Sequence, residues 1–463
     1  MVLSGTCFSL IMDISQQQHI RLAELLSALS HALDLTEGQP RGHCIRCCWI
    51  GTQLGMTIKL WPDELSDLYY TLLLKDLGCS SNAARICELY LADDIGFKRD
   101  FKLIDGSLPQ ALRFVLGHTG LDKSLAERFR AIIGILKNGG EIARELIEAR
   151  CHRGAEIAAK MRFSSTVCDA IQNLDEHWDG GGKPGGRIQK DIPLFSQIAL
   201  LAQVVDVFNI ANGSAAAVRE VLNRSGTWFD PDLVAAFIHL QGQGDFWGIL
   251  AEEGLPELVL DLEPAKAKRL VDEDYLDEIA TGFAQVIDAK STFTRGHSER
   301  VAVFTDMIAE ELGMSPQRRR WLGRGALLHD IGKLAISNAI LDKPGKLTDQ
   351  EFAAIKSHPV HSEAILMNID VFKDLAPVAG GHHERLDGKG YPRGLAGTDI
   401  SLETRIVTTA DIFDALTADR PYRPAMPVSQ AYGIMRKDLG KAIDPNCFEA
   451  LQAALARAEA EVA

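Results

Sequence analysis

The stretch HHERLDGKGYP, residues 382–392, guides the fold assignment because a second stretch repeats it without the histidine pair. DEHWDGGGKP, residues 175–184, keeps the Asp-Gly step and the final proline at the same spacing. The matching residues lie 208 positions apart: Asp179 and Asp387, Pro184 and Pro392, Ile192 and Ile400. Similarity at a fixed offset indicates an internal repeat.

The repeat continues towards the N-terminus at another offset. Gly42-His43 and Gly296-His297 lie 254 positions apart, and in both cases an aspartate, Asp76 or Asp330, follows the histidine by 33 positions. The fall from 254 to 208 means that the first copy carries about 46 extra residues between these blocks. We expect a first copy at 19–225, a helical connector at 226–265 and a second copy at 266–463.

Apolar residues recur at spacings of three and four, whereas β-type alternation is scarce. HIRLAELLSALSHAL, residues 19–33, and YLDEIATGFAQVIDA, residues 275–289, open the two copies with this pattern. A chain of 463 residues is also too long for one ordinary core. The sequence therefore predicts an all-α protein of two tandem helical domains.

Composition excludes several classes of protein. A net charge of −14 argues against nonspecific binding to DNA or to anionic membranes. We find no signal peptide and no apolar run of about 18 residues, so a cytoplasmic protein is expected. The nine cysteines show no disulfide framework. The cluster Cys44, Cys47 and Cys48 is read as buried core rather than zinc ligands, because no second ligand pair follows.

The second copy concentrates imidazoles and carboxylates in a way that suits a transition metal. The candidates are His297, His329, Asp330, His358, His382, His383 and Asp411, with Lys333 among them. One ion needs about four to six donors, so seven candidates favour two ions. Asp330 is expected at the mouth of the site, where Gly332 breaks the helix, and a carboxylate there could bridge the ions. Each residue alone is more typical of a hydrogen-bonded core or a solvated charge.

Helical spacing predicts that these side chains converge. His297 shares a stripe with Val301, Phe304 and Ile308, so its imidazole should face the packed side. Asp411 and Asp414 are three residues apart and share a face. An inward carboxylate needs a partner, and a metal would provide one.

Three motifs carry a resemblance to a known family: GHSERV at 296–301, HD at 329–330 and HHExxDGxGYP at 382–392. They resemble the HD-GYP subgroup of HD-domain metal-dependent phosphohydrolases, from Asp277 to the C-terminus. The resemblance implies an all-helical fold, hydrolysis of the bacterial messenger cyclic di-GMP, and a centre of two or three metals, often iron. Manganese, zinc, cobalt or nickel also suit such ligands.

The resemblance also implies roles for individual residues. The metal ligands would be His297, His329, Asp330, His358, His382, His383 and Asp411, with Asp330 bridging the ions and taking part in catalysis. Lys333 would be catalytic, contacting the scissile phosphate or the leaving oxygen. Arg420, Arg423 and Asp414 would contact the dinucleotide, and Glu384 would support the ligands. Phe293 stands where some three-metal relatives carry a glutamate, so two metals are predicted.

The first copy lacks most of these groups. Lys75, Cys79, Arg150, Leu174, Asp175 and Gln203 stand at the positions of His329, Lys333, His358, His382, His383 and Asp411. Only His43 and Asp76 survive, and two donors rarely hold a metal tightly. The first copy is therefore expected to be degenerate, with a regulatory or structural role. Its cations could pair with Asp76 and Asp175, which is favoured, or bind an anionic effector.

The leading hypothesis is a cyclic di-GMP phosphodiesterase with its chemistry in the second copy. An alternative is a signalling adaptor that binds a nucleotide or a protein partner and turns over little. A third hypothesis keeps the enzyme but changes the substrate to another cyclic dinucleotide, since HD folds host several phosphate chemistries. Partner proteins could bind the loop at 388–392, and a homodimer is compatible with the sequence. The metal identity and the product are left open.

Overall fold

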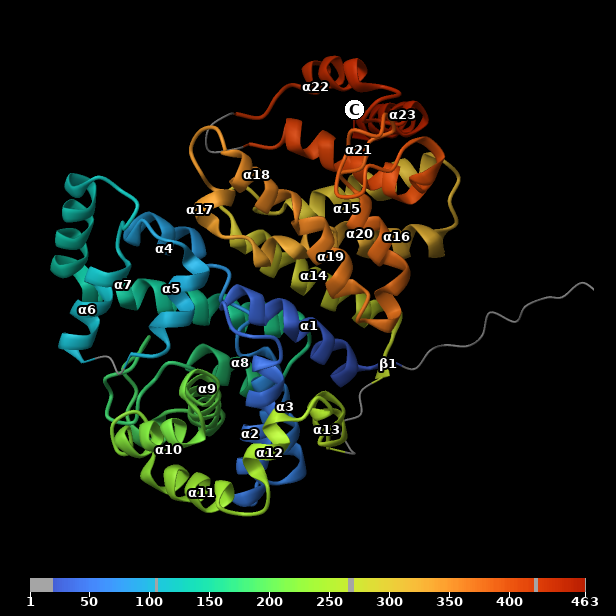
Figure 1. Ribbon diagram of the computed structural model, residues 1–463. Coiled ribbons are helices and arrows are strands. Elements are labelled where there is room, and N and C mark those ends of the chain that lie inside the picture. The colour runs from blue at the N-terminus through green and yellow to red at the C-terminus, as the bar shows by residue number, and fades with distance from the viewer. Residues whose placement is uncertain (1–19, 105–106, 265–269, 420–423, 463) are drawn as a thin grey trace, which may run out of the picture.

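The computed structural model describes residues 20–104, 107–264, 270–419 and 424–462 (Figure 1). The described residues fold as an all-α protein, as predicted. Within them the only strands are β1 (Ile20–Arg21) and β2 (Leu270–Val271), which pair antiparallel. This short ladder ties the start of the first copy to the start of the second.

The first half of the chain contains ten α-helices and a short 3₁₀ helix, η1, in the described residues. They are α1 (Leu22–Thr36), α2 (His43–Thr57), α3 (Pro62–Leu74), α4 (Ala83–Tyr90), α5 (Asp94–Phe101), α6 (Leu108–His118), α7 (Leu125–Lys160), α8 (Ser165–Gln172), η1 (Gln189–Asp191), α9 (Leu194–Asn212) and α10 (Ser214–Asn223). Three more helices lead to the second half: α11 (Pro231–Gln241), α12 (Phe246–Ala251) and α13 (Leu255–Asp261).

In the described residues the second half has no helix as long as α7, and it also consists of α-helices and short 3₁₀ helices. They are α14 (Glu273–Lys290), α15 (His297–Glu311), α16 (Pro316–Leu328), η3 (Ile331–Ala335), α17 (Asn338–Leu341), α18 (Asp349–Lys356), α19 (His358–Leu366), η4 (Asp370–Leu375), α20 (Ala376–Gly381), η5 (Gly397–Asp399), α21 (Leu402–Thr417), α22 (Val428–Met435), η6 (Arg436–Asp438) and α23 (Pro445–Val462).

Matching local geometry accompanies the sequence repeat. Gly42 and Gly296 precede α2 and α15 with φ of 86° and 66°, a left-handed conformation that glycine adopts without strain. The backbone bridge between Ser225 and Phe229 recurs between Leu439 and Ile443, and a proline-initiated helix follows each one. Those helices are α11 and α23. The similarity of the two halves thus includes α11 and α23, while the boundary at residue 225 stays a prediction.

The extra residues of the first copy form α5, α6 and the first part of α7. Of these, α6 and the first part of α7 lie at the edge of the molecule (Figure 1). A small hydrophobic core, which includes Phe97, Phe114 and Ile135, joins these helices to one another and to α4. Ser124 and Glu127 form a capping box that starts α7.

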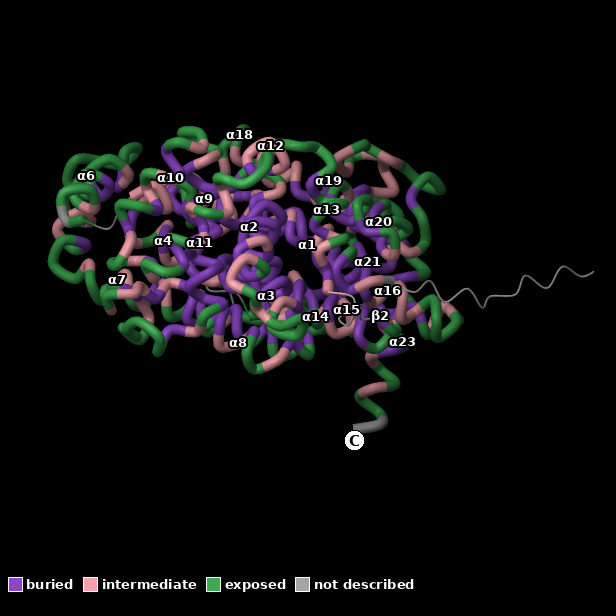
Figure 2. Tube along the Cα trace, turned by 90° about the horizontal axis from the view of Figure 1, so that it is seen from below, coloured by how far each residue is buried: buried purple, intermediate pink, exposed green. Residues whose placement is uncertain are grey.

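One hydrophobic core crosses the boundary between the copies. Leu25 and Leu29 of α1 belong to the same buried cluster as Phe283 of α14 and Leu334 of η3. Buried residues concentrate in the middle of the molecule, around α1, α2 and α14 (Figure 2). A second cluster, which includes Val301 and Phe413, lies within the second copy. The two copies are thus packed together rather than joined only by a linker.

Helix α9 is an exception to the expectation from the sequence that no segment is apolar enough to cross a membrane. A stretch of 18 of its 19 residues reaches a mean hydropathy of 1.6, long and apolar enough for a span. Of that stretch 78% is buried inside the protein, as the core helix of a globular domain would be. Such a helix is weak evidence for a membrane protein.

The described cysteines are all free, and Cys44, Cys47 and Cys48 are buried on α2. Their burial agrees with the prediction that they serve as core residues.

Candidate metal centre

The predicted ligands of the second copy meet at the ends of several helices. His297 begins α15, His358 begins α19, and His329 and His382 directly follow α16 and α20. Asp330 lies between α16 and η3, and Asp411 comes from the middle of α21. Helix ends can bring short side chains from different elements to one point, which is what a multinuclear site needs.

Asp330 lies between two groups of histidines. Its Oδ2 atom is 3.6 Å from His297 Nε2 and 3.3 Å from His329 Nε2. Its Oδ1 atom is 3.2 Å from His358 Nε2 and 3.6 Å from His382 Nε2. Each oxygen of one carboxylate therefore faces a different pair of imidazoles. This is the arrangement in which a carboxylate bridges two cations.

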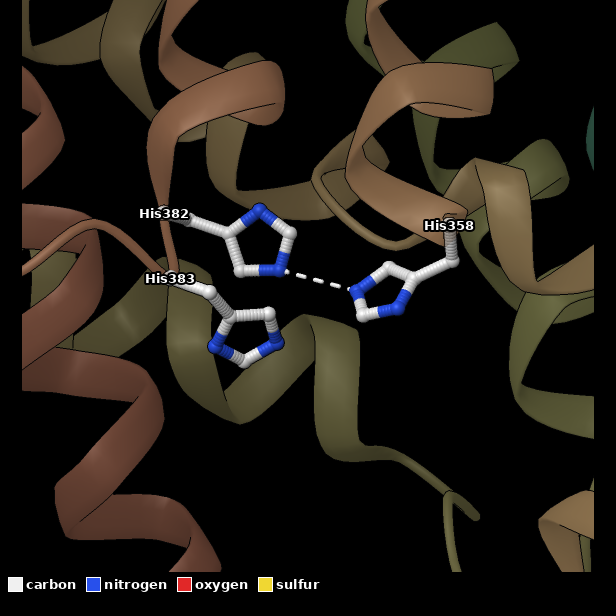
Figure 3. Close-up of side chains that lie close together, drawn as sticks. All are labelled: His358, His382 and His383. Carbon is white, nitrogen blue, oxygen red and sulfur yellow. Dashed lines mark hydrogen bonds between the residues drawn. The ribbon is translucent and has the colours of Figure 1, made fainter. Parts of the chain in front are cut away.

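The Nε2 atoms are directed into the site because the other ring nitrogens are hydrogen-bonded to the backbone. His329, His358 and His382 each place Nδ1 2.6–2.7 Å from the carbonyl oxygen three residues earlier. The N–H on Nδ1 donates to that carbonyl, which leaves the Nε2 lone pair as an acceptor or ligand. Figure 3 shows His358 and His382 pointing towards one another, with His383 beside them.

His297 is held by a carboxylate instead of a carbonyl. Its Nδ1 lies 2.7 Å from Asp414, and Arg300 donates to the same carboxylate at 2.5 and 3.1 Å. Asp414 is buried and turned towards these two residues. In this geometry its carboxylate orients His297 from behind, and the contact of Asp414 with substrate stays a prediction. Asp411, 3.4 Å from His297 Nε2, is the acid of this helix that faces the site.

The loop after the histidine pair is held by Glu384. Its buried carboxylate accepts hydrogen bonds from the backbone N–H groups of Arg393 and Leu395 at 2.7 and 2.9 Å. Glu384 thus shapes the loop and supports the ligands only through the backbone. Tyr391 packs its ring against His383, with centroids 4.9 Å apart.

Burial and charge set the electrostatics of the site. Asp330 is buried, not at a mouth as the sequence suggested, because η3 packs closely against α19. Burial raises the pKa of Asp330, but Lys333 and the histidines outweigh it, so its pKa lies well below the ordinary value. Lys333 donates a hydrogen bond to Asp330 Oδ2 and is partly exposed. Its ammonium therefore lies at the edge of the site.

The residues present fit a metal centre. In the described part of the chain, His329 Nε2 and Asp330 Oδ1 are buried and have no hydrogen-bond partner. Four groups of side chains in the described residues have ligand atoms close enough to share an ion. Two lie in the second copy (His297, His329 and Asp330; His358, His382 and His383) and two in the first (His43, Cys47 and Asp206; Glu37, Asp76 and Cys79). Imidazole and carboxylate donors suit iron, manganese, zinc, cobalt or nickel. Arg420 and Arg423, predicted to contact substrate, lie outside the described residues.

The corresponding centre of the first copy holds a lysine ammonium. Lys75 Nζ lies 3.1 Å from His43 Nε2 and 3.1 Å from Gln203 Oε1, and it donates to Asp76. These three partners occupy the positions of His297, Asp411 and Asp330. His43 Nδ1 is 2.6 Å from Asp206, and Arg46 donates to Asp206 at 2.5 and 3.1 Å, as Asp414 and Arg300 do for His297. The carboxylate and arginine that hold the histidine are the same in both copies, but in the first copy a lysine ammonium lies in front of that histidine.

The other substituted cation is also paired. Arg150 forms an ion pair with Asp175, and Lys102 lies 2.6 Å from Glu37. Burial, followed by Lys75, lowers the pKa of His43 to about 4. Burial also lowers the pKa of His297, but Asp330 and Asp414 outweigh it and raise the value to about 9. His297 therefore lies where a positive charge is stabilised, whereas burial lowers the pKa of His358 in the second centre to about 4, as it does for His43 in the first.

The chain is similar to known proteins over most of its length. The HD domain family model matches residues 137–233 and 282–447, more than half of the chain and part of both copies. The chain belongs to the HD-domain family.

A relative in Vibrio cholerae, 3′3′-cGAMP-specific phosphodiesterase 3, is 54% identical over 439 residues, which is 95% of each chain. The cyclic di-GMP phosphodiesterase response regulator RpfG of Xanthomonas campestris is 40% identical over 176 residues, 38% of this chain and 47% of the relative. A crystal structure of a cyclic GMP-AMP specific phosphodiesterase of V. cholerae superposes with a TM-score of 0.63 at 49% identity. It covers 94% of this chain and 97% of that one.

Sequence reasoning missed the residues that hold this HD-domain centre in place. Asp288 accepts hydrogen bonds from Ser298 at 2.7–3.3 Å, and Thr408 donates to the His382 carbonyl at 2.8 Å. The repeat offered a signal for one such group: Arg46 and Asp206 match Arg300 and Asp414, although most residues at the ligand positions of the first copy changed. Residues that persist where the metal ligands have changed hold the surrounding side chains in position.

Proposed function

We propose that the protein is a metal-dependent phosphodiesterase that hydrolyses 3′3′-cGAMP, with its chemistry in the second copy. The observation that carries the proposal is the position of Asp330, whose two oxygens face separate pairs of histidines at 3.2–3.6 Å. A two-metal site stabilises both the attacking and the leaving oxygen of a phosphoryl displacement. The first copy is proposed to be a degenerate domain in which Lys75 replaces the metal charge.

The choice of substrate follows the relatives. The relative that matches 95% of this chain, degenerate copy included, carries the name of a 3′3′-cGAMP-specific enzyme. The cyclic di-GMP phosphodiesterase RpfG matches only 38% of it. This supports the sequence-based alternative of another cyclic dinucleotide over cyclic di-GMP. Iron is the first candidate metal, as the family resemblance implies.

Each residue of the centre has a proposed task. Asp330 would bridge two ions, one bound by His297, His329 and Asp411 and the other by His358, His382 and His383. Bound divalent ions would supply positive charge to the phosphoryl oxygens and make a bound water nucleophilic. Lys333, at the edge of the site, would add charge where the phosphate becomes more negative. Asp414 and the backbone carbonyls would hold the imidazoles in one tautomer.

The test compares turnover of 3′3′-cGAMP and cyclic di-GMP by anaerobically purified, metal-loaded protein. We expect hydrolysis of 3′3′-cGAMP, a higher kcat/KM for it than for cyclic di-GMP, and loss of turnover in His358→Ala. His361→Ala is the matched control, since it changes a histidine of the same helix outside the cluster. Turnover that survives in His358→Ala would refute the centre. Metal-loaded protein that binds a dinucleotide without cleaving it would favour the adaptor hypothesis.

A further inference from the structure

A carboxylate of the first copy is buried against the second copy. Asp94 begins α5, and its side chain is fully buried. Its Oδ2 accepts a hydrogen bond from Lys290 Nζ at 2.7 Å. Its Oδ1 accepts from the backbone N–H of Asn338 at 2.8 Å and from the Ser337 hydroxyl at 3.2 Å. One side chain of the first copy thus joins two separate segments of the second.

The first of these segments leads to His297. Lys290 is the last residue of α14, and the loop that follows enters α15 at His297. Inside this loop the Thr294 hydroxyl donates to the Ser291 carbonyl at 3.1 Å, and the His297 N–H donates to the Thr294 carbonyl at 2.9 Å. Fixing Lys290 therefore fixes the entrance of the ligand-bearing helix.

The second segment follows Lys333. The Ile336 N–H donates to the Lys333 carbonyl at 3.0 Å, and Ser337 and Asn338 come next, at the start of α17. Asn338 also ties the two segments together, since its side-chain amide donates to the Lys290 carbonyl at 2.5 Å and to Asp342 at 2.7 Å. The exit of η3, which carries Lys333, is held through this network.

The other end of α5 reaches the degenerate centre. Lys98, one turn after Asp94, donates from Nζ to the carbonyls of Thr36 and Cys79 at 3.2 and 2.5 Å. Thr36 and Cys79 occupy the positions of Lys290 and Lys333 in the repeat. One short helix thus contacts equivalent points in both copies.

We propose that Asp94 is a positioning residue for the catalytic centre, through which the degenerate copy fixes the segments that carry His297 and Lys333. The role rests on the proposed phosphodiesterase function. It gives the first copy a task that needs no metal and no effector. A displacement of about 1 Å at a reacting group can cost up to about a hundredfold in rate, so a small shift of Lys333 would be visible in kcat.

The test compares two double variants that both remove the ion pair. Asp94→Asn/Lys290→Met keeps an acceptor oxygen for Asn338, whereas Asp94→Ala/Lys290→Met does not. Neither leaves a charge buried without a partner, so both should fold, with the Ala double variant less stable because the Asn338 N–H loses its acceptor. We expect the Ala double variant to lose about tenfold in kcat for 3′3′-cGAMP with little change in KM or metal content. The Asn double variant should keep most of the wild-type kcat, because Asn338 stays anchored and its side-chain amide still holds the Lys290 carbonyl.

Tyr275→Phe is the control for general loosening between the copies. It removes the hydrogen bond from the Tyr275 hydroxyl to the Met161 carbonyl, 3.0 Å, at the opposite end of α14. We expect wild-type kcat in this variant. Equal kcat in the two double variants, or an equal loss in Tyr275→Phe, would overturn the positioning role. Absence of turnover in the wild-type protein would instead overturn the proposed function, and this role with it.

Discussion

At the scale of single residues, His43 and His297 are held from behind in the same way. The two histidines differ in the groups that lie on their other side. Asp206 holds His43 at 2.6 Å and Asp414 holds His297 at 2.7 Å, each with an arginine on the carboxylate. Across the ring, His43 meets the Lys75 ammonium at 3.1 Å, whereas His297 meets Asp330 and Asp411. The Lys75 ammonium of the first copy therefore fills the space that carboxylates face in the second.

Removing Asp414 should weaken metal binding although Asp414 is not a ligand. Asp414→Ala frees Nδ1 of His297, so the imidazole loses its fixed tautomer and orientation. We expect metal affinity to fall by about 10- to 100-fold, as measured by competition with a chelator. Asp206→Ala is the matched control in the first copy and should leave metal affinity unchanged. Equal effects of the two variants would contradict the assignment of the metal centre to the second copy.

Removing Lys75 should cost stability rather than activity. Lys75→Met leaves the buried Asp76 carboxylate without its cation, and breaking a buried pair in this way costs about 3 kcal/mol. Denaturant unfolding measures the loss, and Lys389→Met, at an exposed position, should change stability by less than about 0.5 kcal/mol. A Lys75→Met protein as stable as the wild type would mean that the ammonium does not hold the first centre together.

At the scale of elements, the centre depends on how closely η3 approaches α19. A Cβ atom at Gly332 would lie 2.0 Å from the His358 carbonyl oxygen, and at the equivalent Gly78 it would lie 1.8 Å from the Arg150 carbonyl oxygen. Only a residue without a side chain allows this contact. It brings Asp330 on one element within reach of His358 on the other.

Gly332→Ala should therefore separate the two halves of the metal centre. The added methyl group must push η3 and α19 apart, at a cost of about 1–3 kcal/mol, and the second metal should be lost first. Metal content per chain and thermal unfolding report both effects. Gly433→Ala is the control, because a Cβ atom there meets nothing within 4 Å. Full metal content in Gly332→Ala would show that the close approach is not needed.

The sequence predicted the helices well where the pattern lies within one short segment of the chain. Helical periodicity gave the all-α fold, and spacing along the chain brought out His297, His329, His358 and His382. The same spacing could not give the role of Asp414, because its partner His297 lies 117 residues away and on another helix. Asp94 was overlooked for the same reason: its contacts with Lys290 and Asn338 exist only after the two copies pack.

At the scale of the whole molecule, the two copies share a core and so act as one folded unit. Leu29 of α1 and Leu334 of η3 belong to one buried cluster, and α1 packs directly against η3. The element that carries Lys333 therefore rests on the first copy. The sequence showed two domains but not this contact, since apolar periodicity shows that a face is buried without showing what covers it.

The central claim is that one copy holds a pair of metals and the other holds a lysine in their place. The most direct measurement is anomalous diffraction from crystals of the metal-loaded protein, with metal content counted on the same sample. We expect two ions about 3.5–4 Å apart, bridged by Asp330, and none beside His43. A single ion in the second copy, or an ion bound by His43, Cys47 and Asp206 in the first, would contradict it.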